Sequence, residues 1–280
     1  MSIDQLLVKK QTLEMEPYSE DKFKASIISC GVDSVQAARI VDLLKPQLYN
    51  GISTVEIHKK AYSFLKKHDS IFASKYILKR AIFELGPTGY PFERLISALL
   101  KKKGYSTKVS VVLNGKCVTH EIDVLAEKDG VAYVVECKFH TDSKAVSNVK
   151  IPLYINSRFL DVQEQWNTDP LHKTYLKQGW LVTNTRFTQD AIDYARCVGL
   201  TLLSWDYPKN NGIKANIDSY GLFPISTLTR LTKKEKQQLI AKDIILVDEL
   251  LQAPCHLIDI VLEDDKIKHV MEEIDRLCNI

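Results

Sequence analysis

The sequence lacks the features that mark a membrane or secreted protein. No uninterrupted apolar run reaches the length of about 18 residues that a transmembrane helix needs. The first residues, MSIDQLLVKKQ, contain no hydrophobic stretch of signal-peptide length. The six cysteines are scattered, with no CxxC pair and no zinc-ligand spacing, which is typical of reduced thiols. Together these absences predict a cytoplasmic protein.

Glycine-rich nucleotide motifs and a strong net charge are also missing. Neither GxxxxGK[ST] nor GxGxxG occurs, so the sequence does not support a P-loop or Rossmann site. The chain has 280 residues, 45% of them hydrophobic and 26% charged, with a net charge of +3. That charge is too small to indicate a nucleic-acid partner by itself, so DNA binding would need basic residues focused in one place. The length favours two or three domains over one core.

The N-terminal part reads as a β-hairpin followed by helices. The hairpin is expected within residues 1–19, and helices are expected at about 20–30, 34–44, 53–65 and 71–85. Ser53 and Glu56 have the spacing of a capping box, which marks the start of the third helix. GPTGYP at 86–91 interrupts the helical pattern and marks a domain boundary.

A second unit begins with an apolar helix stripe that ends at KKKGY. Strand-like segments follow at 107–113, 118–126 and 131–139, then a helix at about 143–168, a strand at 179–185, a helix with Thr188 as its N-cap, and a strand at 200–208. This order predicts an α/β sandwich around a mixed sheet. Residues 220–280 read as short helices. We therefore expect an α/β multidomain protein with domains at 1–88, 89–210 and 220–280.

The segment VVECKFH at 134–140 raises the central question, because Glu136 and Lys138 interrupt an apolar strand. Asp129 and Gly130 form the dipeptide that most strongly indicates a two-residue type I′ hairpin turn. In that register Asp123 faces Glu136, and strand alternation places Glu121 and Lys138 on the same face. If the turn were one residue longer, one strand would flip and the acids would separate.

Two opposed carboxylates repel each other, and a divalent cation removes the conflict. Facing residues have Cβ atoms about 4.5–5.5 Å apart. Mg²⁺ prefers oxygen ligands, is often held by one or two carboxylates, and can activate water for phosphoryl transfer. The ammonium of Lys138 would stabilise developing charge beside it. The hairpin alone leaves open whether this is a metal site or a half-exposed strand with a local ion pair.

Glu93, Asp123 and the run Glu136-Cys137-Lys138 resemble the PD-(D/E)xK nuclease signature, most closely its Mrr-like restriction endonuclease branch. The likeness rests on FERLISALLKKKGY, HEIDVLAEKDGVAYVVECKFH and VTNTRFTQDAIDYARCVGLTLLSWDYP, within residues 89–208. It implies that Asp123, Glu136 and the backbone carbonyl of Cys137 bind Mg²⁺ or Mn²⁺ and that Lys138 is catalytic. Glu93 would be a further acid near the metal, or simply an acid that interacts with the helix dipole.

Residues 5–87 resemble the ATP-cone domain, a helical bundle capped by a β-hairpin that binds ATP or dATP as a regulator. The likeness rests on VKKQTLEMEPYSEDKFKASIISCGVD, GISTVEIHKKAYSFL and SKYILKRAIFELGP. The nucleotide-contacting positions of the family correspond here to Val8, Lys9, Lys10 and Lys22. The usual Asp-Gly after the basic pair is replaced by Gln11-Thr12, and the lysines are also compatible with ordinary surface charges.

The resulting hypothesis is a metal-dependent DNA endonuclease regulated by ATP or dATP, in restriction or DNA processing, and forming a homodimer or higher homo-oligomer. Two alternatives stay open: a nucleotide-responsive DNA-binding regulator that does not cut, and an N-terminal domain that serves only oligomerisation. LTKKEKQQLIAKDIILVDELL near the C-terminus vaguely resembles a helix–hairpin–helix unit, although AKDI replaces its glycine turn, so packing or dimerisation is the other interpretation. Arg158 and Lys144 are candidates for DNA phosphate contacts, and His120 reads as a strand residue on the opposite face.

Overall fold

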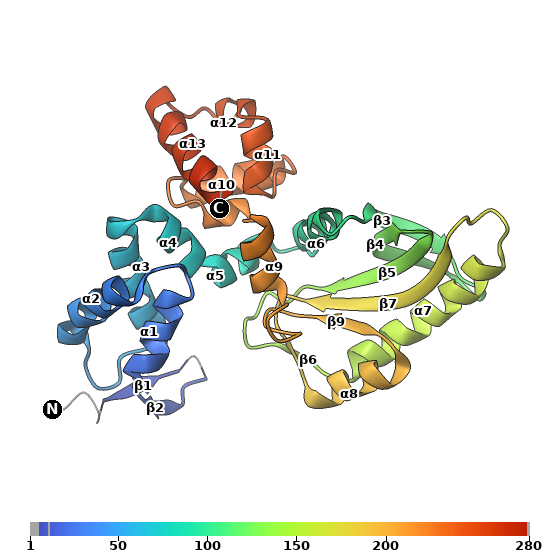
Figure 1. The fold of residues 1–280 in the computed structure, drawn as a ribbon, viewed down its shortest axis with the longest axis horizontal. Helices are drawn as coiled ribbons and strands as arrows, with labels where there is room; N and C mark the ends of the chain where they lie inside the picture. The colour runs from blue at the N-terminus through green and yellow to red at the C-terminus, as the bar shows by residue number, and fades with distance from the viewer. Residues whose placement is uncertain (1–5, 11, 279–280) are drawn as a thin grey trace. The chain divides into compact units, whose positions relative to one another are not determined.

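The computed structural model describes residues 6–10 and 12–278, which form two compact units. The first unit contains the described residues up to Leu78 together with Thr227–Leu231. The second contains Lys79–Ser226 and the residues from Thr232 onward. Each unit is therefore built from two separate stretches of the chain (Figure 1).

The first unit is a small helical bundle with a β-hairpin. Its elements are β1 (Leu7–Lys9), β2 (Met15–Pro17), α1 (Glu20–Ile28), α2 (Ser34–Leu44), α3 (Thr54–His68) and α4 (Ser70–Tyr76). β1 and β2 pair antiparallel. The side chain of Ser53 accepts the backbone N–H of Glu56 at 3.0 Å, as the capping pattern predicts. The single helix expected at 71–85 is wrong, because Ile77 takes φ −89° and ψ 2° and separates α4 from α5 (Leu78–Phe83).

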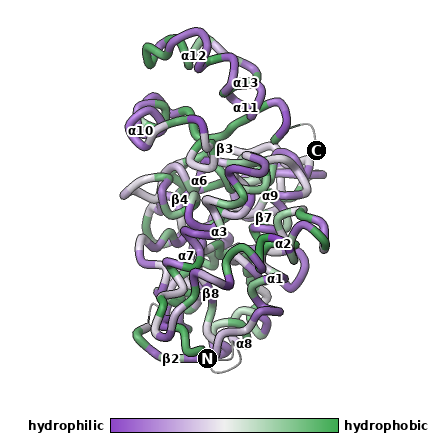
Figure 2. Tube along the Cα trace, turned by 90° about the vertical axis from the view of Figure 1, so that its left-hand side faces the viewer, coloured by the Kyte–Doolittle hydropathy of each residue, from purple (hydrophilic) through white to green (hydrophobic). Residues whose placement is uncertain are grey.

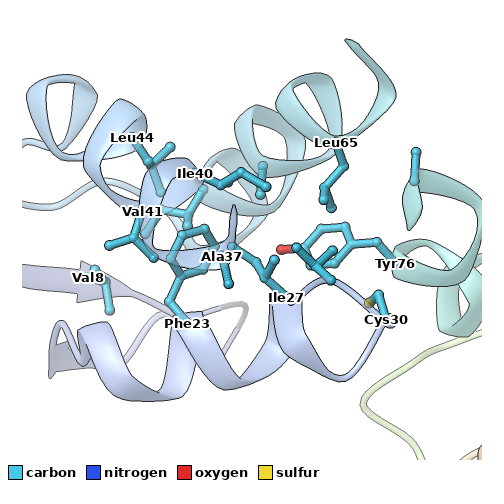
Figure 3. Packing of buried hydrophobic residues seen from close by; sticks show 14 of the residues in the cluster. Val8, Phe23, Ile27, Cys30, Ala37, Ile40, Val41, Leu44, Leu65 and Tyr76 are labelled. Atoms are coloured by element: carbon cyan, nitrogen blue, oxygen red, sulfur yellow. The ribbon is translucent and has the colours of Figure 1, made fainter. Parts of the chain in front are cut away.

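Buried apolar side chains from the hairpin and the helices hold this unit together. Figure 3 shows Phe23 and Ile27 of α1 packed with Val41 and Leu44 of α2, with Leu65 of α3 beside them. Ile27, Leu44 and Leu65 are fully buried. These are the positions at which the helical pattern of the sequence places apolar residues, so the amphipathic faces account for the core.

The second unit contains a five-stranded mixed sheet, as predicted. Its strands are β3 (Ser106–Asn114), β4 (Thr119–Lys128), β5 (Val131–Lys138), β7 (Tyr175–Thr183) and β9 (Thr201–Leu203), in this spatial order. β3, β4 and β5 pair antiparallel, whereas β5, β7 and β9 pair parallel. The antiparallel half follows from short hairpin turns, and the parallel half needs helical crossovers.

Helices cover both faces of this sheet (Figure 1). α6 (Tyr90–Lys102) packs on one face, where Phe92 contacts Phe139 and Ser97 bonds Thr107. α7 (Lys150–Thr168) and α8 (Gln189–Val198) pack on the other face. α7 begins later than the expected residue 143, since the side chains of Asp142 and Asn148 accept the N–H groups of Lys144 and Lys150 in local turns. Between these turns β6 (Val146–Ser147) pairs with β8 (Arg186–Phe187).

The C-terminal segment of the second unit is helical, as the sequence indicates. It contains α9 (Ile213–Tyr220), α10 (Lys233–Ala241), α11 (Val247–Gln252), α12 (Cys255–Ile258) and α13 (Asp264–Cys278). Hydrophilic and hydrophobic residues alternate along these helices (Figure 2). Arg94 of α6 forms ion pairs with Asp243, which follows α10, and with Glu249 of α11 at 2.9 Å. Among the described residues no helix is long and apolar enough to cross a bilayer.

Candidate active site

The hairpin between β4 and β5 has the register that the Asp129-Gly130 dipeptide predicts. Asp129 and Gly130 have φ of 51° and 76°, so both residues occupy the left-handed region that a type I′ turn requires. Lys128 pairs with Val131, and the pairing continues to Val124 and Val135. The pairing ends there, one position before Asp123 and Glu136. The longer-turn alternative is therefore wrong.

Strict alternation, however, is interrupted at Asp123. Ile122 and Leu125 are three residues apart yet lie in one hydrophobic cluster with Phe159 of α7. In β3 the pairing with β4 omits Ser110, whose φ is 52°, at the position opposite Asp123. The carboxylate of Asp123 instead reaches the next strand, where its Oδ2 accepts the backbone N–H of Cys137 at 2.6 Å. The irregularity thus directs Asp123 toward the ExK segment of β5.

Three acids influence one another at this end of the sheet. Burial raises the pKa of Glu136 to about 7, and the charge of Asp123 adds to the effect. Burial also raises the pKa of Glu93, which lies in the first turn of α6, to about 7, with Asp123 and Glu121 contributing. The pKa of Asp123 is raised by burial as well, although the Cys137 N–H and Arg158 oppose the shift. Glu93, Asp123 and Glu136 are therefore close enough for their charges to raise one another's pKa values.

Lys138 is exposed at the end of β5, close enough for its charge to act on Asp123. Its positive charge lowers the pKa of Asp123. Lys138 also lines an open cavity of about 330 Å³ with Gly89, Cys137 and His140. Burial raises the pKa of the half-exposed Cys137 thiol well above its ordinary value. A cation on an exposed strand end, next to buried carboxylates and an open cavity, suits contact with an anionic substrate.

Arg158 of α7 contacts Glu136, which the sequence pattern did not indicate. It was expected to meet DNA phosphate, but its Nη1 donates to Oε2 of Glu136 at 2.7 Å, and its Nη2 donates to the carbonyl of Glu121. Its Nε lies 3.5 Å from Nδ1 of His120. One available signal was its position among the buried residues of α7, since Ile155 and Val162 share its side of the helix.

His120 and Asp161 extend this network away from the carboxylates. Nε2 of His120 lies 2.7 Å from Oδ2 of Asp161. The backbone N–H groups of Cys117 and Val118 also donate to the Asp161 carboxylate. The bond to His120 and these N–H groups hold the pKa of Asp161 below its usual range. His120 is therefore part of the site's surroundings and not only a strand residue.

The oxygen atoms at this site are of the kind that bind a hard divalent cation. Oε1 of Glu136 is buried and has no hydrogen-bond partner among the described residues, so it is available as a ligand. On the neighbouring strand, Oδ2 of Asp123 accepts the backbone N–H of Cys137, the residue that follows Glu136. Within residues 6–10 and 12–278 no three His, Cys, Asp or Glu side chains converge on a metal position. Two carboxylates with waters and substrate oxygens are a common arrangement for Mg²⁺.

The predicted nucleotide-contacting residues of the first unit differ in exposure. Val8 points into the hydrophobic cluster shown in Figure 3, and only 6% of its surface is exposed, so its side chain cannot meet a polar ligand. Lys9 and Lys22 are exposed. Lys10 forms an ion pair with Glu16, and the charges of Lys10 and Lys22 lower the pKa of that carboxylate. Gln11, part of the altered turn, lies outside the described residues.

Comparison with known proteins identifies two segments of the chain. Residues 87–153 match the family model described as restriction endonuclease. Residues 223–278 match the model described as AF1548-like, C-terminal. The candidate site residues from Glu93 to Lys138 lie inside the first match. The chain thus has a restriction-endonuclease domain within a mixed α/β unit, followed by an AF1548-like C-terminal domain.

Related proteins have been found by sequence and by structure. An uncharacterized protein of Archaeoglobus fulgidus is 36% identical over 183 residues, which cover 65% of this chain and 99% of the relative. The crystal structure of a protein of unknown function, AF1548, matches with a TM-score of 0.55 and 34% identity over 69% of this chain and 99% of that one. MspJI restriction endonuclease in complex with a 27-mer oligonucleotide covers 71% of this chain and 39% of that chain, at 13% identity and a TM-score of 0.32, which is too distant to support an argument. On the strength of the first two relatives, the chain belongs to the AF1548-like family.

Proposed function

We propose that this protein is a metal-dependent DNA endonuclease whose catalytic residues are Asp123, Glu136, Lys138 and Glu93. The observation that carries the proposal is the buried carboxylate of Glu136, with one unpartnered oxygen, beside Asp123 and Lys138 in a segment that matches restriction endonucleases. Buried carboxylates with raised pKa values are typical of functional sites. Restriction or DNA processing is the corresponding role.

The reaction would hydrolyse a phosphodiester bond. Water oxygen forms a bond to phosphorus while the bond to one sugar oxygen breaks, and that oxygen leaves with a proton. A divalent cation held by Asp123, Glu136 and the Cys137 carbonyl would supply positive charge and a lower pKa for water. The ammonium of Lys138 would donate to a phosphate oxygen in the transition state. Glu93, with its pKa near 7, can take up a proton at its carboxylate at neutral pH.

Cleavage assays on several forms of DNA test this proposal. With Mg²⁺ or Mn²⁺, wild-type protein should cut, and Glu136→Ala should cut at least about 100-fold more slowly. Removing the cation with EDTA should stop the wild type. Glu272→Gln, which changes an exposed acid on α13, is the matched control and should cut normally. Equal cleavage by wild type and Glu136→Ala would mean a contaminant or a different site.

We also propose that the first unit binds ATP or dATP and regulates the nuclease. The support is the hairpin-capped helical bundle with Lys9, Lys10 and Lys22 near its hairpin. Lysine ammonium groups serve as point charges for phosphates. Nucleotide would favour one conformation or oligomeric state and would not supply energy for cutting. A thermal shift of several degrees at saturating ATP is the expected signature.

A DNA-binding regulator without nuclease activity is the second candidate. The observation that favours it is the ion pair between Arg158 and Glu136, which already offsets one of the charges that a metal would neutralise. DNA binding without cleavage under every divalent cation tested would support this function over the first. The homodimer or higher homo-oligomer expected from sequence stays a prediction, which light scattering of the full chain measures directly.

A further inference from the structure

Glu136 has two oxygen atoms in different situations. Oε2 accepts the Nη1 of Arg158 at 2.7 Å. Oε1 is buried without a hydrogen-bond partner among the described residues. A guanidinium that holds one oxygen fixes the rotation of the carboxylate, and so it also fixes the direction in which the other oxygen points. Glu136 is 7% exposed, so solvent cannot readily replace this support.

Arg158 is itself held from several directions. Its Nη2 donates to the Glu121 carbonyl, its Nε lies 3.5 Å from Nδ1 of His120, and its guanidinium carbon lies 5.6 Å from the ring centroid of Tyr154. Because arginine only donates, Nδ1 of His120 is the acceptor in this contact, which leaves Nε2 as the nitrogen that carries a proton toward Asp161 at 2.7 Å. The Arg158 side chain is 17% exposed, which limits its alternative positions.

The last residue of this chain of contacts is fixed to the backbone. The carboxylate of Asp161 accepts the backbone N–H groups of Cys117 and Val118 at 2.8 Å and 3.3 Å. The backbone carbonyl of Asp161 accepts the N–H of Lys116. Gly115 makes this approach possible, since a Cβ there would lie 2.1 Å from Oδ2 of Asp161. The turn between β3 and β4 is thereby fastened to α7. Rigid elements therefore support every step from Asp161 to Glu136.

We infer that Arg158, supported by His120 and Asp161, is a positioning residue that presents Oε1 of Glu136 to the divalent cation. This inference rests on the proposed function, because it concerns the metal at the proposed nuclease site. Residues that orient metal ligands through hydrogen bonds typically contribute about 10–100-fold to metal affinity. The opposite possibility is that Arg158 competes with the cation for Glu136. The two ideas predict opposite signs for the same substitution.

Calorimetric titration of the full chain with Mn²⁺, without DNA, separates them. Arg158→Gln should weaken Mn²⁺ binding about 10–100-fold. Arg158→Lys keeps the positive charge but loses the several N–H donors of the planar guanidinium, so its Mn²⁺ affinity should fall between those of Arg158→Gln and wild type. His120→Ala removes the contacts with Arg158 and Asp161 but leaves the bond between Arg158 and Glu136, so it should weaken binding less than Arg158→Gln. Arg186→Gln, which breaks an exposed ion pair with Asp206, is the control and should bind like wild type.

Each outcome has a definite reading. Unchanged or tighter Mn²⁺ binding by folded Arg158→Gln overturns the inference, and tighter binding shows competition. If Arg158→Gln does not fold by circular dichroism, His120→Ala decides: weaker binding supports the inference and unchanged binding overturns it. If wild type and Glu136→Gln show the same Mn²⁺ titration, no metal binds at Glu136 and the proposed metal-dependent function fails as well. If Glu136→Gln loses the Mn²⁺ binding of the wild type and Arg158→Gln retains it, only the positioning role of Arg158 is overturned.

Discussion

Burial and mutual proximity raise the pKa values of the acids at the end of the sheet. Glu93 and Glu136 both have pKa values raised to about 7, from ordinary values of 4.5, because they are buried and lie near Asp123. A raised carboxyl pKa means that the folded state holds protons more tightly than the unfolded state does. Stability from this source is complete below about pH 4.5 and is lost as pH rises through about 7. The metal-free protein should therefore lose stability across this range.

Replacing Glu93 by glutamine removes one of the interacting charges. In EDTA, the difference between the thermal midpoints of Glu93→Gln and wild type should be more in favour of Glu93→Gln at pH 8 than at pH 5. The expected change is about 2–4 °C, the equivalent of roughly 1 kcal/mol, discounted because Glu93 is half-buried and partly screened by solvent. Differential scanning calorimetry at both pH values measures it. Glu272→Gln should show no such trend, and a flat difference for Glu93→Gln would contradict the raised pKa.

The contacts of the site residues differ in how far the sequence predicts them. Asp123, Glu136 and Lys138 lie within 16 positions of one another, around a turn whose type the sequence encodes, so their proximity was predictable. Arg158 meets Glu136 across 22 positions and His120 across 38. That contact depends on how α7 is rotated over the sheet, and helical periodicity predicts which face is apolar but not which strand residue a bordering charge will meet.

Among the elements, the β4–β5 hairpin controls the site most directly. Its turn fixes the register up to Val124 and Val135, and the carboxylate of Asp123 then accepts the N–H of Cys137, the residue after Glu136. The local sequence was enough to predict this turn because Asp129 and Gly130 tolerate positive φ. Element boundaries were less predictable where tertiary structure or side-chain turns intervene. The helix expected over 71–85 breaks at Ile77, and the helix expected from 143 begins at Lys150.

The turn can be tested through Gly130, whose φ is 76°. A Cβ at this position would meet nothing within 4 Å, so the cost of Gly130→Ala is conformational and not steric. A loss of about 1–2 kcal/mol in the free energy of unfolding is expected. Urea unfolding measures it. Asp129→Asn is the matched control, because asparagine adopts positive φ readily; equal stability of Gly130→Ala and wild type would mean that the turn relaxes to another type.

On the scale of the whole molecule, the two compact units have different proposed tasks. The second unit holds the proposed nuclease residues and most of the segment that matches the AF1548-like C-terminal model, since Thr227–Leu231 belong to the first unit. The first unit holds the lysines proposed to meet nucleotide phosphates, and its core is separate from that of the sheet. If nucleotide changes DNA affinity, DNA must change nucleotide affinity by the same factor. Binding data on either ligand thus constrain the other.

Glu16 provides a way to test the first unit within the full chain. Its carboxylate pairs with Lys10 and also feels the charge of Lys22, so a phosphate that binds these lysines must compete with it. Glu16→Gln should therefore tighten ATP or dATP binding by only about 3–5-fold, because solvent screens an exposed ion pair and leaves it a small contribution. In calorimetric titrations Lys10→Ala with Lys22→Ala should weaken binding, whereas Lys67→Ala, an exposed lysine on α3, should not.

The same variant distinguishes regulation from binding alone. If nucleotide acts on the nuclease by shifting a conformational equilibrium, Glu16→Gln should show the full change in DNA cleavage rate at about 3–5-fold lower nucleotide concentration than wild type. The rate at saturating nucleotide should be the same in both proteins, because Glu16 is not part of the catalytic site. A shifted binding curve with a cleavage rate that never responds to nucleotide would show that the first unit binds nucleotide without controlling the nuclease.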